Sequence, residues 1–307
     1  MKTLTIGIPT FGRDHVLGNT IRNVLQYMDP DTMELIVADQ NPTHSQEFQN
    51  QLQKWQEEGA VRWLRLDAPC GTRAKNEILR LANADIVLFL DDDVILPESL
   101  FREHLEQHQN ERIAAVTGQC FNCCDSANPP CIDNPNIGTL PYFERVEGGL
   151  GNSIAGGNCS VKRRCAFELG GFDENFIASQ LGEDMDFARR LLNRNYLIYY
   201  NPNAWLIHLR SPIGGCTIKG SKVWAEWTHT SGLFLYAFRH GLKRGNFWKI
   251  FWMALRNGPL RGEILVRPWR LPWALGGMLK GLAYGIRHRA VISGINGAVC
   301  LAGNGAA

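Results

Sequence analysis

The first two hundred residues of the chain alternate between two hydrophobic patterns. Short apolar runs at 4–9, 34–39 and 85–90 are typical of strands, and residues 61–66 alternate between apolar and polar as a strand does. Segments with helical spacing of apolar residues, or with a polar, glutamine-rich composition, lie between them at 14–27, 45–58 and 72–82. Strands that alternate with helices in this way predict an α/β protein with a mostly parallel, doubly wound sheet.

Two further helices are predicted at Lys162–Leu169 and Gly182–Asn193, followed by an aromatic strand at Tyr196–Tyr200 and an apolar segment that ends at His208. Residues 118–157 are rich in Cys, Asn, Pro and Gly, which predicts a long irregular segment. In doubly wound sheets, ligands bind beyond the carboxyl ends of the strands. The polar residues that close the predicted strands are therefore the first candidates for a site.

The character of the chain changes near residue 210. From Ser221 onward the pattern predicts amphipathic helices rich in Trp, Arg and Gly, so we expect a first domain at 1–210 and a helical extension at 211–307. Residues 209–307 hold 14 lysine and arginine residues against two acidic ones, whereas the preceding residues hold 18 basic and 28 acidic residues. A basic extension on an acidic body indicates an anionic partner for the extension.

Several features bear on the compartment and on metal binding. The N-terminus lacks the long apolar stretch of a signal peptide, and no uninterrupted apolar run reaches the ~18 residues of a membrane-spanning helix, so we expect a cytoplasmic protein with free thiols. One cysteine cluster could instead bind zinc, although neither a second cluster nor nearby histidines are evident. Its members are Cys120, Cys123, Cys124 and Cys131.

Three consecutive carboxylates follow the most apolar predicted strand, in the sequence LFLDDDVILP at 88–97. Adjacent negative charges repel one another unless a cation neutralises them, and Mg²⁺ and Mn²⁺ prefer such oxygen ligands and can bridge to phosphates. A solvated acidic turn in which an aspartate caps the next helix is the alternative interpretation. Pro97 is expected at the first position of that helix.

A second acidic group occupies a predicted helix start in LGEDMDFARRL at 181–191. Glu183, Asp184 and Asp186 could simply stabilise the helix dipole, or one of them could act as a general base at a rigid helix end. Glycine pairs at 156–157 and 170–171 would allow tight turns and close approach of the backbone to a ligand.

Taken in order, these motifs resemble the family-two glycosyltransferases, which are inverting enzymes of the GT-A fold, over residues 3–210. The segment IGIPTFGR at 6–13 resembles the opening strand and nucleotide loop of the family, and GTRAKN at 71–76 resembles its G-x-x-A-R-N motif with a lysine in place of the usual arginine. The carboxylates at 91–93 are similar to its D-x-D motif. The resemblance implies donor-binding roles for Pro9, Thr10, Arg13, Asp39, Lys75, Asn76, Asp91 and Asp92.

The same resemblance implies a catalytic chemistry. Asp93 and His208 would bind a divalent cation, Mn²⁺ or Mg²⁺, although a histidine on an apolar segment is by itself more often structural. Asp184 would be the base that deprotonates an acceptor hydroxyl, and a single in-line displacement would invert the anomeric carbon. The implied donor is a nucleotide-diphosphate sugar, most simply a UDP-sugar, and no nucleic-acid partner is expected.

Two other functions compete with this interpretation. A sugar nucleotidyltransferase would carry its glycine-rich signature in the first strand–helix turn, where this chain has PTFGRDH, and a Rossmann dehydrogenase fails for the same reason. A non-catalytic adaptor at a membrane surface could keep the fold without turnover. The carboxylates present at both acidic motifs argue against that loss of activity.

The extension offers a second prediction. It holds six of the nine tryptophans, interleaved with its positive charge. Tryptophan favours the membrane interface, and basic residues are attracted to anionic lipid, so we expect amphipathic helices that lie on an anionic membrane surface at its inner face. A lipid-linked glycan would then be a fitting acceptor. The alternative is that these helices pack on the first domain, with tryptophans in the core and arginines paired to its acidic surface.

Overall fold

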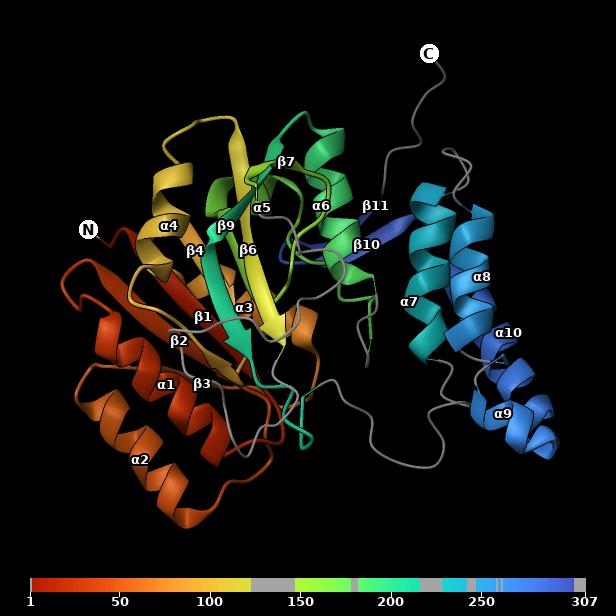
Figure 1. The fold of residues 1–307 in the computed structure, drawn as a ribbon, viewed down its shortest axis with the longest axis horizontal. Coiled ribbons are helices and arrows are strands. Elements are labelled where there is room, and N and C mark those ends of the chain that lie inside the picture. Colours follow the sequence, from red (N-terminus) through yellow and green to blue (C-terminus); the bar gives the residue numbers. More distant parts are fainter. Residues whose placement is uncertain are drawn as a thin grey trace. The chain divides into compact units, whose positions relative to one another are not determined.

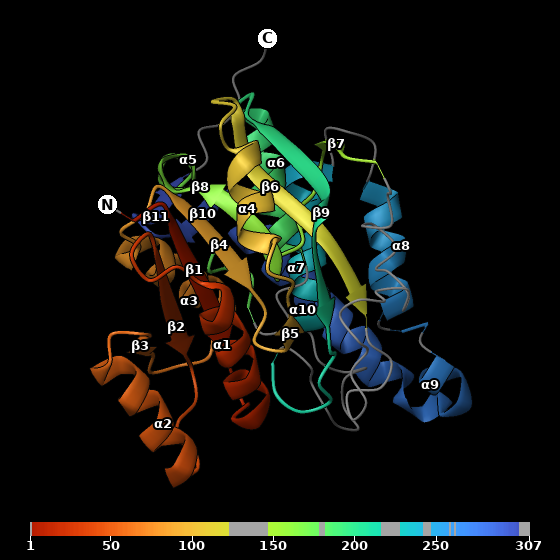
Figure 2. The same ribbon diagram turned by 60° about the vertical axis from the view of Figure 1, so that its left-hand side comes forward.

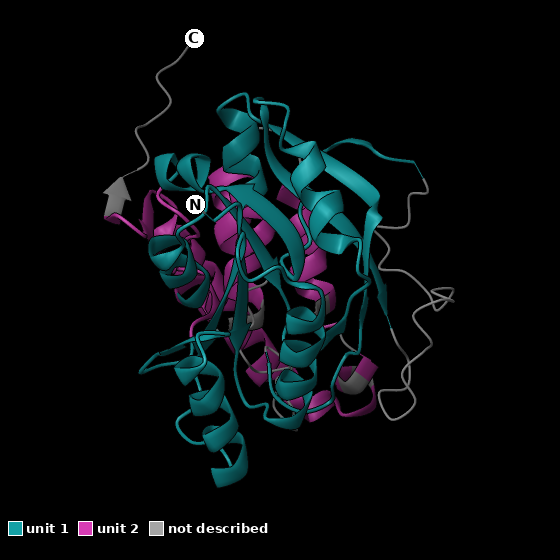
Figure 3. Cartoon of the chain, turned by 90° about the vertical axis from the view of Figure 1, so that its left-hand side faces the viewer, with its two compact units in different colours: residues 1–69, 74–169, 188–215 teal, residues 70–73, 170–187, 216–307 magenta. Residues whose placement is uncertain are grey.

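The computed structural model describes residues 2–122, 147–177, 182–215, 228–241, 247–257, 259–260 and 262–300. The chain divides into two compact units, shown in different colours in Figure 3. The first unit comprises Met1–Pro69, Ala74–Leu169 and Ala188–Gly215. The second comprises Cys70–Arg73, Gly170–Phe187 and Cys216–Ala307, so it takes two short pieces from the sequence that precedes residue 210.

The first unit is built on a single sheet. Within the described residues its strands follow the order β3-β2-β1-β4-β8-β6-β9-β5, and β7 pairs with β9 (Figures 1 and 2). All but β5, β7 and β8 point in the same direction, so the sheet is mostly parallel. The strands are β1 (Leu4–Thr10), β2 (Met33–Asp39), β3 (Arg62–Arg65), β4 (Ile86–Leu90), β5 (Val94–Ile95), β6 (Ile113–Asn122), β7 (Gly149–Gly151), β8 (Asn158–Lys162) and β9 (Leu197–His208).

Helices cover both faces of this sheet because the side chains of each strand alternate between the faces. Ile6 and Ile8 of β1 share a buried cluster with Leu17 of α1, whereas Gly7 faces the other way. A Cβ at Gly7 would lie 2.5 Å from Cγ2 of Ile78 in α3, so α3 packs closely on the opposite face. The helices are α1 (His15–Tyr27), α2 (Gln46–Glu57), α3 (Gly71–Leu81), α4 (Leu100–Gln107), α5 (Arg163–Glu168) and α6 (Glu183–Asn193).

Two local predictions are wrong. Pro97 does not open a helix: α4 begins at Leu100 after an N-cap at Ser99, because residues 94–95 pair with β9 before the chain turns. The segment expected to be irregular from residue 118 instead continues β6 to Asn122, where it pairs with β9. The cysteines at 123, 124 and 131 lie outside the described residues. Cys120 is buried with a free thiol, and burial raises its pKa to about 12.

The second unit contains the C-terminal helices. Phe234 of α7 packs with Ile250 of α8 and Met278 of α10, and Phe176 joins the same cluster. A Cβ at Gly285 would lie 2.8 Å from the backbone of α7, so this glycine permits close packing of α10 on α7. The elements are α7 (Thr228–Tyr236), a π-helical turn (Ala237–Gly241), α8 (Phe247–Asn257), α9 (Gly262–Val266), a 3₁₀ turn (Pro268–Arg270), α10 (Leu271–His288), β10 (Val291–Gly294) and β11 (Gly297–Cys300).

None of the helices in the described part of the chain combines the length and the apolar character needed to cross a bilayer.

Candidate active site

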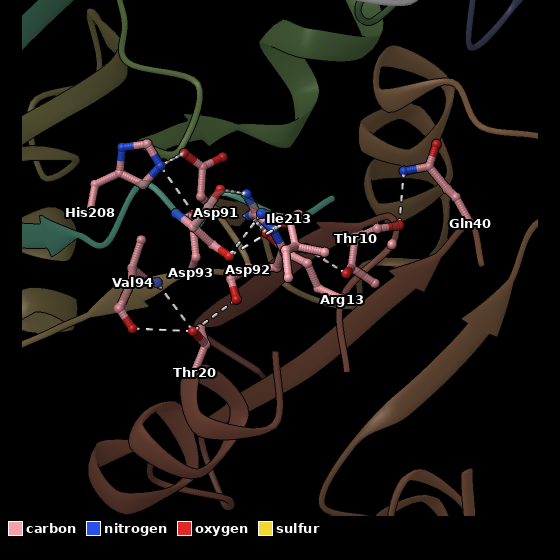
Figure 4. A network of polar contacts seen from close by, with 12 residues as sticks. Thr10, Arg13, Thr20, Gln40, Asp91, Asp92, Asp93, Val94, His208 and Ile213 are labelled. Carbon is pink, nitrogen blue, oxygen red and sulfur yellow. Dashed lines mark hydrogen bonds and ion pairs between the residues drawn. The ribbon is translucent and has the colours of Figure 1, made fainter. Parts of the chain in front are cut away.

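The three consecutive carboxylates lie in the turn between β4 and β5 (Figure 4). The side chain of Asp91 is 49% exposed, whereas Asp92 and Asp93 are buried. Val94 of β5 pairs with His208 at the end of β9, and this pairing brings the histidine beside the turn. The sheet topology therefore joins two motifs that are more than a hundred residues apart in the sequence.

Asp91, Asp93 and His208 form a group that can hold a metal ion. Each offers one ligand atom, and these atoms all lie within 4.8 Å of one another. Nε2 of His208 is 3.2 Å from Oδ1 of Asp93 and 3.7 Å from Oδ2 of Asp91. An imidazole and two carboxylates are a ligand set that suits a divalent cation such as Mn²⁺.

The Oδ1 atom of Asp93 gives an independent reason to expect a cation. It is buried and makes no hydrogen bond within the described residues, although nitrogen atoms of Arg13 and His208 lie 3.1 and 3.2 Å away. The other oxygen, Oδ2, accepts a hydrogen bond from the backbone N–H of Ser211 at 2.8 Å. Arg13 and His208 contact this oxygen as ion pairs without a hydrogen bond to it, so its hydrogen-bonding capacity is left for a metal ion.

Asp92 turns away from that group and is held by residues of the first strand–helix turn. Oγ1 of Thr10 donates a hydrogen bond to it at 2.6 Å, and the guanidinium group of Arg13 pairs with its other oxygen. Thr20 of α1 fixes the backbone of the turn, because its hydroxyl donates to the carbonyl of Asp92 at 3.0 Å. Thr10, Arg13 and Thr20 thus hold the turn that carries the three carboxylates.

Arg13 is itself anchored on the other side. Its Nε donates to the carbonyl of Ile213 at 2.8 Å, and Nη2 donates to that of Ser211 at 3.3 Å. Two hydrogen bonds therefore hold the arginine to the segment after β9, and Figure 4 shows Ile213 beside Arg13. Thr10 and Arg13, which the resemblance assigns to the donor, make these contacts with protein groups, and their contact with a nucleotide stays a prediction.

The pKa values follow from this arrangement. Burial raises the pKa of Asp92 to about 6 against the opposing effect of Arg13. Burial would also raise the pKa of Asp93, but its close contact with His208 and the positive charge of Arg13 outweigh burial and lower it. Burial would lower the pKa of His208, yet the neighbouring Asp93 and Asp91 raise it. Each of the three residues is therefore sensitive to any cation placed beside it.

Asp39 closes β2 next to Thr10 of β1 and is completely buried. Its carboxylate accepts hydrogen bonds from the backbone and side chain of Asn41, at 2.9 and 2.8 Å, and from Nε1 of Trp63 at 2.8 Å. Nε2 of His44 lies 2.8 Å from the same carboxylate. The predicted contact of Asp39 with the nucleobase or ribose would have to form beside these bonds.

His44 links two carboxylates at this end of the sheet. Its second ring nitrogen lies 2.6 Å from Oδ1 of Asp14. Burial would lower the pKa of His44, but its hydrogen bonds to Asp14 and Asp39 raise it. No periodic pattern in the sequence marks this histidine, which lies in the loop between β2 and α2.

The remaining predicted donor residues occupy separate positions in the first unit. Pro9 lies in β1, and Lys75 and Asn76 lie on α3 with both side chains buried. Asp184 belongs to the second unit, in the first turn of α6 with Glu183 and Asp186, where the sequence predicts them. The structure thus assembles Thr10, Arg13, Asp91, Asp92, Asp93 and His208 into one network.

Two residues of the site carry no recognisable signal in the sequence. Ser211 contributes only its backbone N–H and carbonyl, which no residue-type pattern can reveal. Thr20 lies within the predicted helix 14–27, where a threonine is unremarkable. Only the pairing of distant segments identifies them.

Comparison with known proteins identifies the class to which this fold and site belong. A family profile described as "Glycosyl transferase family 2" matches residues 5–163. Because this match covers more than half of the chain, the protein belongs to glycosyltransferase family 2. The sheet described above is accordingly that of the GT-A fold.

One curated relative is the poly(ribitol-phosphate) beta-N-acetylglucosaminyltransferase TarP of Staphylococcus aureus (strain N315). It is 34% identical over 101 residues, which are 32% of this chain and 30% of TarP. The match therefore spans about a third of the length of that relative.

Solved structures resemble the chain over most of its length. S. aureus TarS in complex with UDP-GlcNAc has a TM-score of 0.66 and 12% identity, and the match covers 92% of this chain and 81% of that one. The mannosyltransferase PcManGT from Pyrobaculum calidifontis, in complex with GDP-Man and Mn²⁺, has a TM-score of 0.57 and 18% identity, with coverage of 91% and 75%. At these identities the likeness concerns the fold.

Proposed function

We propose that this protein is a metal-dependent inverting glycosyltransferase that moves a sugar from a nucleotide-diphosphate sugar to an acceptor hydroxyl. The observation that carries the proposal is the group formed by Asp91, Asp93 and His208 in a member of glycosyltransferase family 2, with a buried carboxylate oxygen that makes no hydrogen bond within the described residues. Relatives of the same fold were solved with GDP-Man and Mn²⁺ or with UDP-GlcNAc, which supports a nucleotide-sugar donor.

Different residues of the chain would have different roles in this reaction. Asp93 and His208, with Asp91, would hold Mn²⁺ or Mg²⁺, and such a cation offsets the charge of a nucleoside diphosphate as it leaves. Asp92 with Arg13 and Thr10 keeps the acidic turn in place. Asp184, at the start of a helix, would accept the proton of the acceptor hydroxyl as the oxygen attacks the anomeric carbon.

A screen of nucleotide sugars tests the donor half of the proposal. We expect one of them, with a UDP-sugar first in line, to be hydrolysed slowly in the presence of Mn²⁺ or Mg²⁺, and acceptor trials then use that donor. Asp184→Asn should reduce the transfer rate by about 10²–10⁴-fold and leave donor affinity nearly unchanged. A protein that binds UDP no better with Mn²⁺ than without it would instead fit the adaptor.

We infer further that the C-terminal helices dock on an anionic membrane. Four tryptophans of α8 and of the segment around the start of α10 are largely exposed: Trp248 by 72%, Trp252 by 58%, Trp269 by 65% and Trp273 by 63%. The tryptophans at 224 and 227 lie outside the described residues. Exposed tryptophans in such number support an interfacial role over the alternative in which the tail tryptophans form core.

The arrangement along α10 supports the same inference. Its buried positions are small or flexible, at Ala274, Met278, Gly281 and Gly285, whereas Leu271, Leu275 and Leu279 recur every four residues and are exposed. An apolar stripe therefore remains outside the core of the second unit. The exposed cations Lys249, Arg256, Arg267 and Lys280 lie in the same helices or beside them, which favours anionic lipid as the occupant.

A protein held at such a surface would meet a lipid-linked glycan acceptor. The cytoplasmic location that the sequence predicts, at the inner face of the membrane, stays a prediction, as do the acceptor and the donor sugar.

A further inference from the structure

The segment that precedes the proposed base is built onto the C-terminal end of the chain. The backbone N–H of Glu174 donates to the carbonyl of Ser293 at 2.6 Å, and that of Ile295 donates to the carbonyl of Gly170 at 2.9 Å. The hydroxyl of Tyr284 donates to the carbonyl of Asn175 at 2.8 Å. All of these residues belong to the second unit, so the C-terminal extension is part of the scaffold of this segment.

Two buried aspartates in the same unit share one arginine. Nη1 of Arg239 lies 2.8 Å from Oδ2 of Asp173 and 2.8 Å from Oδ1 of Asp186. Both aspartate side chains are completely buried, and the arginine side chain is 2% exposed. Two buried carboxylates so close together need a shared cation, because an unpaired charge in the interior is strongly unfavourable. Arg239 therefore links residue 173 to the first turn of α6.

The rest of the guanidinium group binds the backbone between α10 and β10. Nη2 donates to the carbonyls of His288 and Val291 at 3.3 and 3.1 Å, and Nε donates to that of Arg289 at 3.4 Å. The carboxylate of Asp173 also accepts the backbone N–H of Ser293 at 2.9 Å. One side chain thus joins the turn at 173, the start of α6 and the entry to β10.

The backbone that carries Arg239 is unusual. Residues 237–241 form a π-helical turn, and Nε2 of His240 lies 2.9 Å from the same oxygen of Asp186 that pairs with Arg239. Consecutive residues of a regular α-helix point in different directions, whereas here both reach a single carboxylate atom. Single π-turns inserted in helices occur frequently at functional sites.

We propose that Arg239 is a positioning residue for the reaction: by pairing with Asp186 and Asp173 it fixes the first turn of α6, and with it the carboxyl group of Asp184. The inference rests on the proposed function, in which Asp184 is the general base. Asp184 lies two residues before Asp186 in the same turn, so a shift of Asp186 displaces the base. Small displacements of reacting groups reduce rates steeply, by about a hundredfold for 1 Å.

The test compares Arg239→Gln and Arg239→Lys with Arg287→Gln, an exposed arginine on α10 of the same unit. Each purified full-length variant is checked by circular dichroism, and its affinity for UDP with Mn²⁺ is measured by calorimetry. Transfer is then measured at saturating donor and acceptor. We expect UDP affinity to stay within twofold in all three, kcat to fall at least tenfold in Arg239→Gln and at least threefold in Arg239→Lys, and Arg287→Gln to match the wild type.

The separate behaviour of kcat and UDP affinity distinguishes positioning from a general loss of structure, which would lower both. If Arg239→Gln does not fold, Arg239→Lys decides, because it keeps the charge that the two aspartates require. A wild-type kcat in a folded Arg239 variant overturns the inference. A different result would contradict the proposed function itself. In that case Asp184→Asn would keep the wild-type transfer rate, independently of the rates of the Arg239 variants.

Discussion

The carboxylate of Asp91 occupies the space that a side chain at residue 157 would need. A Cβ at Gly157 would lie 2.0 Å from Oδ2 of Asp91 and 2.2 Å from its Cγ. The two residues are also joined through the backbone, where the N–H of Asp91 donates to the carbonyl of Gly157 at 3.2 Å. A glycine at this position therefore lets one of the three potential metal ligands reach its place.

Gly157→Ala should impair metal binding more than folding. The added methyl group forces the Asp91 side chain to rotate, at a cost on the order of 1 kcal/mol in unfolding free energy, and removes one ligand atom from the group. We expect UDP affinity in the presence of Mn²⁺ to fall at least tenfold by calorimetry. Gly276→Ala, where a Cβ meets no atom within 4 Å, is the matched control. Unchanged Mn²⁺-dependent affinity in Gly157→Ala would remove Asp91 from the metal site.

Asp93→Asn should abolish transfer, because it replaces the charged, buried oxygen that has no hydrogen bond with a neutral amide. The difference in UDP affinity with and without Mn²⁺ should disappear. Asp92→Asn is the control of equal charge change, and it should reduce activity less because Asp92 pairs with Thr10 and Arg13 instead of the metal group. Near-normal turnover by Asp93→Asn would mean that the metal is bound elsewhere or not at all.

The exposed tryptophans predict binding to anionic vesicles. The wild type should co-sediment with vesicles that contain phosphatidylglycerol, and this binding should weaken with salt, since each basic residue near the surface contributes about 1 kcal/mol. Replacing Trp248 and Trp252 together by serine should reduce binding at least fivefold without loss of folding, because both side chains are largely exposed. Phosphatidylcholine vesicles are the control. If the wild type does not bind anionic vesicles at low salt, the exposed tryptophans have no role in lipid binding.

Two buried histidines predict a loss of stability in mild acid. His104 lies between Asn158 and Ser160, and His108 contacts the same serine. Burial lowers their pKa values to about 4 and about 3, against about 6.5 for an unfolded histidine. Below pH 6.5 the unfolded chain therefore binds protons that the folded chain does not, and each histidine costs up to about 1.4 kcal/mol of unfolding free energy per pH unit.

Urea unfolding at pH 7, 6 and 5 checks this expectation. A His108→Gln variant should be less stable at pH 7 and should lose less stability between pH 7 and pH 5 than the wild type. Equal losses in the two proteins would show that His108 does not contribute. The raised pKa of His44 acts in the opposite sense, since its stabilisation is complete below pH 6.5 and is lost as the pH rises through its folded pKa.

The hydrophobic pattern predicts the parallel half of the fold well. The runs at 34–39 and 85–90 correspond to β2 and β4, and 45–58 contains α2, because each element buries one face locally. The chain after Asp93 is harder to predict. Residues 94–95 form a strand because they pair with β9. Nothing in the sequence around Val94 indicates this partner, which lies more than a hundred residues away.

Part of the candidate site can likewise be predicted from the sequence, and part cannot. Carboxylates after an apolar strand are visible in the sequence, since the combination of charge and position is unusual. The bracing of Asp92 by Thr10 and Arg13 depends on tertiary contacts, as does the backbone N–H that Ser211 directs at Asp93. The separation of the chain near residue 210 likewise leaves out the pieces at 70–73 and 170–187, which belong to the same compact unit as the extension.

The pairing of residues 170–175 with Ser293 and Ile295 has a consequence for how the chain is made. A ribosome releases the segment that leads to Asp184 long before it has synthesised the residues that receive it. Until the ribosome has made residues 233–278, Phe176 lacks its apolar neighbours, and until it has made Arg239 the aspartates at 173 and 186 lack their arginine. A nascent chain that ends just before residue 239 therefore already contains strands β1 to β9 of the sheet, whereas the aspartates at 173 and 186 still lack the arginine that pairs with both.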